Sequence, residues 1–116
     1  MIAEILVASF YLCNNAKGEG GRLTSLGRRC DPRALTVAHP TYKYGRKLII
    51  CHDRHCVIAK VNDRGPFVKG RDIDVTPEVA KRLHMLGHGV VRVTVSFMPL
   101  PRPNFGDRKD VVAAAN

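Results

Sequence analysis

Three carboxylates surround a Gly-Pro turn near the middle of the chain, and carboxylates can give protons to a reacting bond or take them from it. Asp63 precedes Gly65 and Pro66, whereas Asp72 and Asp74 follow them. The sequence therefore predicts a polar site in this part of the chain.

A strand predicted over residues 56–62 would carry the first carboxylate. Its β-branched residues favour an extended backbone, and Pro66 must end it because proline has no N–H to donate to a neighbouring strand. Asp63 and Arg64 are therefore expected at the rim of the sheet.

A second short strand, predicted over residues 72–75, would carry the other two carboxylates. Polar and apolar residues alternate along it, so its two aspartates face one side and its two aliphatic residues face the other. A helix predicted over residues 77–85 follows, with Thr76 as its N-cap and Gly87 as its terminator. Asp74 is thus expected just outside the positive end of a helix.

The rest of the chain predicts one mainly β domain. Its 116 residues support a single core, and many short strands with one helix are typical of a closed barrel. Residues 1–98 are predicted to form this domain, and residues 99–116, proline-rich and then charged, a C-terminal tail. Further strands are predicted over residues 4–11, 34–38, 47–51 and 90–97.

The run N-D-R-G-P-F-V-K-G-R-D-I-D-V-T, residues 62–76, resembles the RlpA (rare lipoprotein A) family. The upstream segment Ala34-Leu-Thr-Val-Ala-His39-Pro carries the same resemblance, which extends from about Ala8 to Val95. It implies a mainly β fold, a six-stranded double-psi β-barrel with one short α-helix, which expansins share more distantly. No cofactor is implied.

The same resemblance implies bacterial peptidoglycan as the substrate and a lytic transglycosylase reaction. One acidic group would protonate the glycosidic oxygen after N-acetylmuramic acid and then take the proton of the attacking muramoyl hydroxyl. Asp74 matches the family's aspartate and His39 its histidine, so these are the predicted catalytic residues, with His39 positioning substrate or tuning Asp74. Two alternatives stay open: Asp74 as a helix N-terminal charge, and His39 as a structural histidine that bonds a loop carbonyl.

Four further residues are candidates for substrate binding. Asp63 could instead accept N–H bonds within its own turn, and the two arginines could pair with the carboxylates rather than grip those of the substrate. The predicted substrate-binding residues are Asp63, Arg64, Arg71 and Asp72.

One departure from the family bears on activity. Family members carry Thr-Ala-x-Gly-Glu in the loop before the second predicted strand, and Arg28 stands here in place of that glutamate. Glu19 of the same loop could substitute for it. A barrel that binds cell-wall glycan without cutting it, as expansins behave, is therefore the alternative function.

The four cysteines predict two disulfides. Cys51 and Cys56 would face each other across a hairpin, with Cα atoms about 4.5 Å apart, which leaves Cys13 to pair with Cys30. Two disulfides imply an oxidising compartment, hence a periplasmic or extracellular envelope location. A zinc site formed by the Cys51-His52-His55-Cys56 segment is the rival interpretation, although no metal site is predicted.

Charge and hydropathy limit the classes of partner that the sequence predicts. The net charge of +9 is dispersed along the chain, which favours polyanions in general, but no nucleic-acid-binding motif accompanies it. The apolar stretch over residues 5–13 is too short for a membrane helix and makes a poor signal peptide. A monomeric envelope protein and a phage-encoded lysis or tail component both fit these observations.

His84 and His88 have the spacing of metal ligands on one helix face. Gly87 would break the helix between them. Both are therefore predicted to be exposed residues at the helix end.

Overall fold

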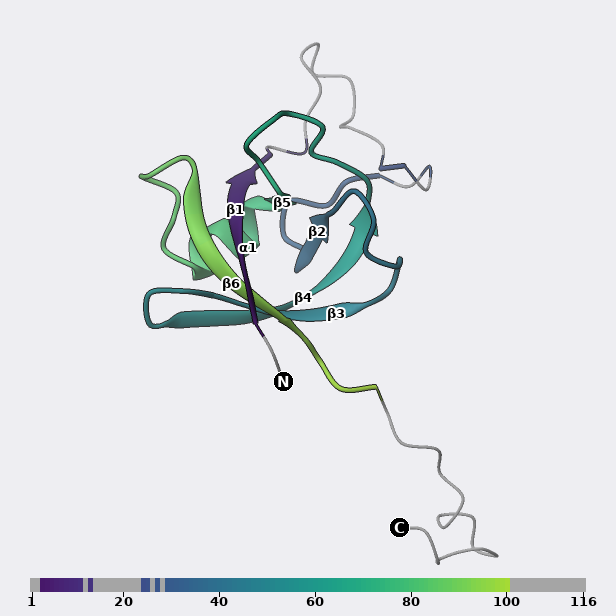
Figure 1. The fold of residues 1–116 in the computed structure, drawn as a ribbon. Helices are drawn as coiled ribbons and strands as arrows, with labels where there is room; N and C mark the ends of the chain where they lie inside the picture. The colour runs from purple at the N-terminus through teal and green to yellow at the C-terminus, as the bar shows by residue number, and fades with distance from the viewer. Residues whose placement is uncertain (1–2, 12, 14–23, 26, 28, 101–116) are drawn as a thin grey trace, which may run out of the picture.

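Six strands close into a barrel in the order β1-β5-β2-β4-β3-β6 (Figure 1). This computed structural model describes residues 3–11, 13, 24–25, 27 and 29–100. The mainly β, six-stranded barrel with one short helix is the architecture that the sequence predicts. The elements are β1 (Glu4–Phe10), β2 (Thr36–Ala38), β3 (Lys47–His52), β4 (His55–Asp63), β5 (Ile73–Val75), α1 (Pro77–Arg82) and β6 (Val91–Phe97).

The pairing of the strands brings distant parts of the sequence together. β5 runs parallel to β1 and antiparallel to β2, while β2 runs parallel to β4. The short strand β5 is thus enclosed by β1 and β2, and the loop between β4 and β5 crosses the end of the barrel at which β1 finishes (Figure 1).

Strict alternation of side chains builds the core. Along β4, Val57, Ala59 and Val61 are buried, whereas Ile58 and Lys60 between them are exposed. The same alternation holds along β6. The core is made of Ala8, Val37, Leu48, Ile50, Val57, Ala59, Val61, Ile73, Val75, Val79, Ala80, Leu83, Met85, Val93 and Val95.

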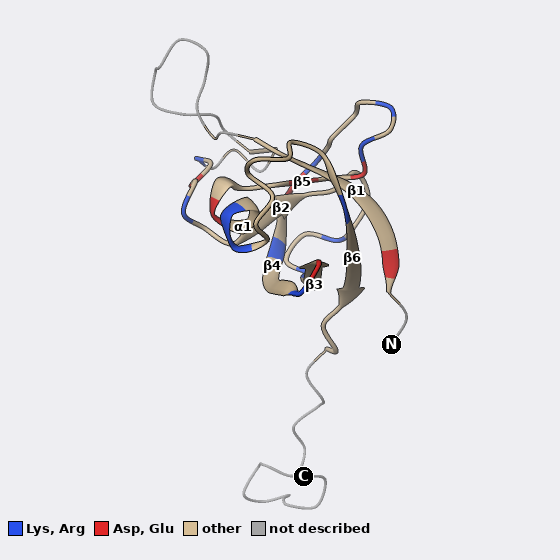
Figure 2. Cartoon of the chain, turned by 90° about the vertical axis from the view of Figure 1, so that its left-hand side faces the viewer, with Lys and Arg blue, Asp and Glu red and all other residues tan. Residues whose placement is uncertain are grey.

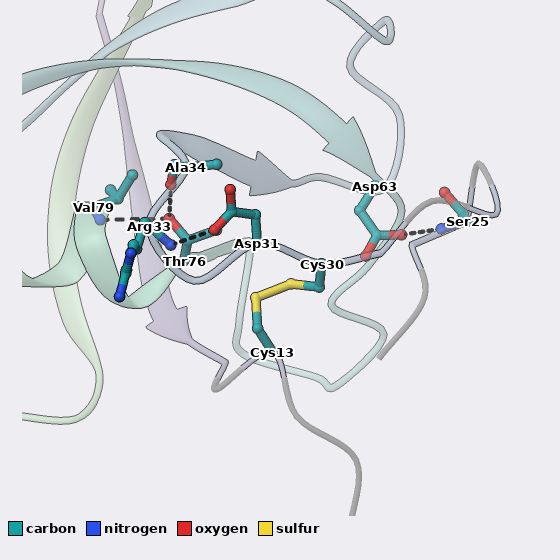
Figure 3. The surroundings of a disulfide bond; sticks show 9 residues. All are labelled: Cys13, Ser25, Cys30, Asp31, Arg33, Ala34, Asp63, Thr76 and Val79. Atoms are coloured by element: carbon teal, nitrogen blue, oxygen red, sulfur yellow. Dashed lines mark hydrogen bonds between the residues drawn. A yellow bond between two sulfur atoms is a disulfide. The ribbon is translucent and has the colours of Figure 1, made fainter. Parts of the chain in front are cut away.

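The helix begins as predicted and ends earlier than predicted. The Thr76 hydroxyl accepts a hydrogen bond from the Val79 N–H at 3.4 Å and donates one to the Ala34 carbonyl at 2.7 Å (Figure 3). The helix stops at Arg82 rather than at residue 85, because His84 takes a left-handed conformation with φ of 55°.

The early stop of the helix lets its last apolar residues reach the core. The His84 N–H donates to the Lys81 carbonyl and the Met85 N–H to the Ala80 carbonyl, which is the Schellman pattern. Leu83 and Met85 are fully buried as a result. Gly87 is therefore not the terminator.

Both predicted disulfides are present. Cys51 pairs with Cys56 across the β3–β4 hairpin with a Cα–Cα distance of 4.0 Å, slightly shorter than the expected spacing. Cys13 pairs with Cys30 at 5.2 Å, and this disulfide packs against Ala38 of β2. It thereby fixes the ends of the loop before β2 to the outside of the barrel.

The basic residues of the described chain are not confined to one helix or strand. Lys and Arg residues are spread over strands, loops and α1 in the described part of the chain (Figure 2). No helix among the described residues is long and apolar enough to span a membrane.

Candidate active site

Asp74 occupies the centre of β5. In the strand register it lies opposite Ser9 of β1 and Ala38 of β2. Its neighbours Ile73 and Val75 are fully buried in the core, so strand alternation directs the Asp74 side chain to the outer face of the barrel wall. There it is half-buried, and its Oδ1 accepts a hydrogen bond of 2.5 Å from the Ser9 hydroxyl.

Ser9 is a site residue that the sequence does not reveal. It is only 4% exposed, and its hydroxyl fixes one oxygen of Asp74 while leaving the other without a hydrogen bond among the described residues. The two residues are 65 positions apart in sequence. The signal in the sequence is a polar residue that follows the apolar run of residues 5–8 within β1.

Asp72 joins the start of β5 to β1. Its N–H donates to the Val7 carbonyl at 2.8 Å, and its Oδ2 accepts from the Val7 N–H at 2.8 Å. The carboxylate therefore acts as a backbone partner where the strand pairing begins. This geometry favours a structural role, and substrate binding by Asp72 stays a prediction.

Asp63 is buried at the end of β4 and holds two loops together (Figure 3). Its Oδ1 accepts N–H bonds from Ser25 at 2.7 Å and from Arg64 at 2.8 Å. Because the residue is only 3% exposed, the contacts support the structural alternative, in which the aspartate accepts N–H bonds of its own turn.

Arg64 folds back over the turn that follows β2. Its Nη1 donates to the carbonyl of Tyr42 at 2.7 Å and to that of His39 at 3.2 Å. Its guanidinium carbon lies 3.8 Å from the centre of the Tyr44 ring, a cation–π contact. Arg64 thus connects the turn after β4 to His39, as a loop clamp rather than as an ion-pair partner of the aspartates.

His39 is buried and held by the loop after β2. Its Nδ1 accepts N–H bonds from Thr41 at 3.1 Å and Tyr42 at 3.0 Å, so in the neutral ring the proton lies on Nε2. The histidine is therefore held by loop N–H groups, whereas the structural alternative expected it to bond a loop carbonyl. Burial lowers the pKa of His39 below its ordinary value, with the Glu4 carboxylate opposing this shift and the Arg64 guanidinium reinforcing it.

Tyr42 extends this cluster across the end of the barrel. Its ring stacks on His39 with centroids 3.4 Å apart and meets Phe97 edge-on at 4.8 Å. Its hydroxyl donates a hydrogen bond to the Glu4 carboxylate. Burial, and then this bond to Glu4, raise the pKa of Tyr42 well above its usual range, so the hydroxyl stays protonated.

The predicted site residues thus fall into two neighbouring groups. Asp63, Arg64 and His39 contact one another, whereas Asp74 lies beside them through Ala38, the residue before His39. No hydrogen bond or ion pair joins His39 to Asp74 within the part of the chain that the structure describes. Their catalytic roles stay predictions.

The loop that carries the replaced glutamate is held against Asp63. Arg28 and Glu19 themselves lie outside the described residues. Ser25 of the same loop bonds Asp63 through its N–H and Tyr44 through its hydroxyl at 2.7 Å.

Four of the five histidines gather where the β3–β4 hairpin meets the end of α1. His55 stacks on His84 with centroids 3.7 Å apart, and His52 meets His88 at 6.2 Å. His84 and His88 are exposed beyond the helix end, and their contacts with the hairpin are an addition to the prediction.

The structure argues against the zinc interpretation of the hairpin. The sulfur atoms of Cys51 and Cys56 are bonded to each other in a disulfide, so neither is a thiolate that could bind zinc. Over residues 3–11, 13, 24–25, 27 and 29–100, no group of three or more His, Cys, Asp or Glu side chains is arranged to hold a metal ion.

The buried, neutral His39 predicts a loss of stability in acid. Since the pKa of His39 is lowered in the folded state, the unfolded chain binds the proton more readily. The contribution of the neutral ring to the free energy of unfolding is therefore complete above pH 6.5 and declines as the pH falls below it. We expect the free energy of unfolding in urea to fall more for the wild type than for His39→Asn between about pH 7.5 and about pH 5.5. An equal fall in both proteins would contradict the assignment, because the other four histidines are common to both.

The domain is similar in sequence to known proteins of one family. Residues 3–95 match the protein family described as lytic transglycolase. The chain is 37% identical over 94 residues to a "Probable endolytic peptidoglycan transglycosylase RlpA" of Nostoc sp., covering 79% of this chain and 25% of that protein. It is 37% identical over 98 residues to the endolytic peptidoglycan transglycosylase RlpA of Pasteurella multocida, covering 83% of this chain and 32% of that protein. The chain therefore spans about a quarter to a third of the length of these relatives.

A solved structure shares the fold at low identity. A mutant Clavibacter michiganensis expansin in complex with cellohexaose aligns with a TM-score of 0.64 and 14% identity, covering 88% of this chain and 53% of that chain. At this identity the likeness shows the fold alone.

Proposed function

This chain belongs to the lytic transglycolase family, and from that membership we propose that it cleaves the glycan strands of bacterial peptidoglycan by a lytic reaction. The relatives named as endolytic peptidoglycan transglycosylases support peptidoglycan as the substrate. The observation that carries the proposal is the carboxyl group of Asp74, half-buried on the outer barrel wall and oriented by Ser9.

Asp74 supplies both proton transfers in this proposal. As a carboxylic acid it gives its proton to the glycosidic oxygen while the bond from that oxygen to the anomeric carbon breaks. As a carboxylate it then takes the proton of the muramoyl C6 hydroxyl while that oxygen bonds to the anomeric carbon. The ring closes as a 1,6-anhydro sugar, and no water is consumed.

Ser9 determines which oxygen of Asp74 acts. The Ser9 hydroxyl occupies Oδ1 at 2.5 Å, so Oδ2 is the oxygen that faces the substrate. A carboxylate held by such a bond loses little freedom when the sugar binds, which is how orientation contributes to catalysis.

His39 positions the site rather than exchanging protons with Asp74. Its Nδ1 is occupied by two loop N–H groups, and Arg64 holds its carbonyl. These bonds leave the Nε2–H as a donor, suited to a sugar hydroxyl or acetamido oxygen.

The alternative function is glycan binding without cleavage. Arg28 replaces the family's loop glutamate, and the barrel shares its fold with an expansin solved with cellohexaose. In this case the same surface would hold the glycan strand while Asp74 remains unused.

We place the protein in the periplasm or outside the cell. Both disulfides fit an oxidising compartment, and peptidoglycan lies there.

The two functions are separated by incubating the purified chain with isolated sacculi. We expect soluble glycan fragments to accumulate with wild-type protein above a no-protein control. If the wild type pellets with sacculi and releases nothing, while Arg28→Glu releases fragments, the natural protein is a binding module. The binding must persist in salt that abolishes binding to DNA, because attraction to phosphates falls steeply with salt concentration.

A further inference from the structure

The β4–β5 loop (residues 64–72) is fixed at both ends to the candidate active site. At its start, Arg64 bonds the His39 and Tyr42 carbonyls. At its end, Asp72 exchanges two hydrogen bonds with Val7 of β1. The loop is therefore held in place before any ligand binds.

The tip of this loop exposes a large apolar side chain. Phe67 is 80% exposed and Val68 is 55% exposed. The Phe67 ring lies beside the backbone of Gly65, whose φ is 114°, and a methyl group at Gly65 would be 3.5 Å from Cε2 of the ring. The Cδ2–Cε2 edge of the ring thus lies near Gly65, and most of the side chain faces solvent.

Two cations follow the aromatic ring. The Lys69 and Arg71 side chains are exposed, and neither makes a hydrogen bond or ion pair within the described part of the chain. Arg71 is three residues before Asp74, so its Cα can lie at most about 11 Å from that of Asp74. The loop therefore presents an exposed aromatic ring and two exposed cations, of which Arg71 lies near the candidate catalytic carboxyl in sequence.

We propose that the β4–β5 loop is a binding platform for the sugar strand, with Phe67 stacking on a pyranose ring and Lys69 and Arg71 contacting carboxylates of the glycan. This inference rests on the proposed function and adds the residues that hold the substrate. The face of an aromatic ring is apolar and carries partial negative charge, which suits the C–H face of a pyranose. Peptidoglycan combines such faces with carboxylates, as the loop combines an aromatic ring with cations.

The chain has no tryptophan, which provides a direct probe. Phe67→Trp, made in the Asp74→Asn background so that nothing is cut, would carry the only indole. We expect its fluorescence to change saturably on titration with N-acetylglucosamine oligosaccharides, which are neutral. Phe67→Ala in the same background should bind them roughly tenfold more weakly, measured by calorimetry.

A matched control and a charged ligand complete the test. Leu86→Ala removes another exposed apolar side chain, 48% exposed beyond α1, and should leave affinity unchanged. The double variant Lys69→Gln, Arg71→Gln should bind the neutral oligosaccharides normally but lose affinity for soluble peptidoglycan fragments, most clearly at low salt.

The outcomes separate this inference from the proposed function. If Phe67→Ala binds the oligosaccharides as well as its parent, the platform is wrong even when wild-type protein still releases glycan from sacculi. If Phe67→Ala binds weakly, the platform stands whether or not the chain cuts. If the parent binds neither oligosaccharide nor sacculi, both proposals are wrong.

Discussion

Replacing Asp74 with asparagine is expected to reduce glycan release from sacculi by about 100-fold or more, because an amide cannot give and retake the proton. The amide has nearly the same shape and can still accept the Ser9 hydroxyl bond, so the barrel should keep its stability. The rate of release of soluble muropeptides measures the first effect, and urea unfolding measures the second.

The control for this substitution is Asp53→Asn. Asp53 lies at the tip of the β3–β4 hairpin with its side chain 78% exposed, so the same chemical change there should leave release unaffected. Activity retained by Asp74→Asn would mean that another group supplies the proton, even if the fold and family are right.

Truncating Asp63 to alanine is expected to lower the free energy of unfolding by about 3 kcal/mol. The change removes a buried carboxylate that accepts N–H bonds from Ser25 and Arg64, and hydrogen bonds to charged groups contribute about 1.5–3 kcal/mol each. Such a loss is a large fraction of the stability of an ordinary domain. Urea denaturation at neutral pH measures it.

The matched substitution is Asp31→Ala. Asp31 also accepts a backbone N–H bond, from Arg33 at 2.9 Å, but it does so on the surface (Figure 3). We expect it to cost less than about 1 kcal/mol. Equal losses from the two substitutions would show that Asp63 does not hold the loops together.

Local patterns in the sequence predict much of the barrel. The alternation of polar and apolar residues along β5 and β6 indicates which side chains are buried, and the Cys51–Cys56 disulfide follows from hairpin geometry. The order of the strands does not follow from such patterns, because parallel pairs such as β1–β5 join segments far apart in sequence. The resemblance to a known family implies the type of barrel, and the strand order is seen only in the structure.

The end of the helix shows why tertiary contacts override local signals. Gly87 is a strong terminator in sequence, yet the chain leaves the helix at Arg82. Burial of Met85 in the core needs that earlier turn, and His84 adopts the left-handed conformation to allow it.

The candidate site was predicted in part. The sequence motif identifies Asp74 and His39, but it does not identify the residues that contact them. Ser9 is recognised only once β1 and β5 are paired, whereas Tyr42, three residues after His39, is a local contact that a His-Pro turn could have suggested. The Arg64 clamp on two carbonyls likewise depends on how the loops fold.

We propose that this barrel cuts peptidoglycan by closing a sugar ring on itself. Mass spectrometry of the fragments released by wild-type protein from purified sacculi tests it most directly. Lytic cleavage predicts fragments ending in 1,6-anhydro-N-acetylmuramic acid, each lighter by one water than the corresponding hydrolysis product, and absent from Asp74→Asn digests. Fragments that all end in ordinary reducing sugars would contradict the lytic mechanism.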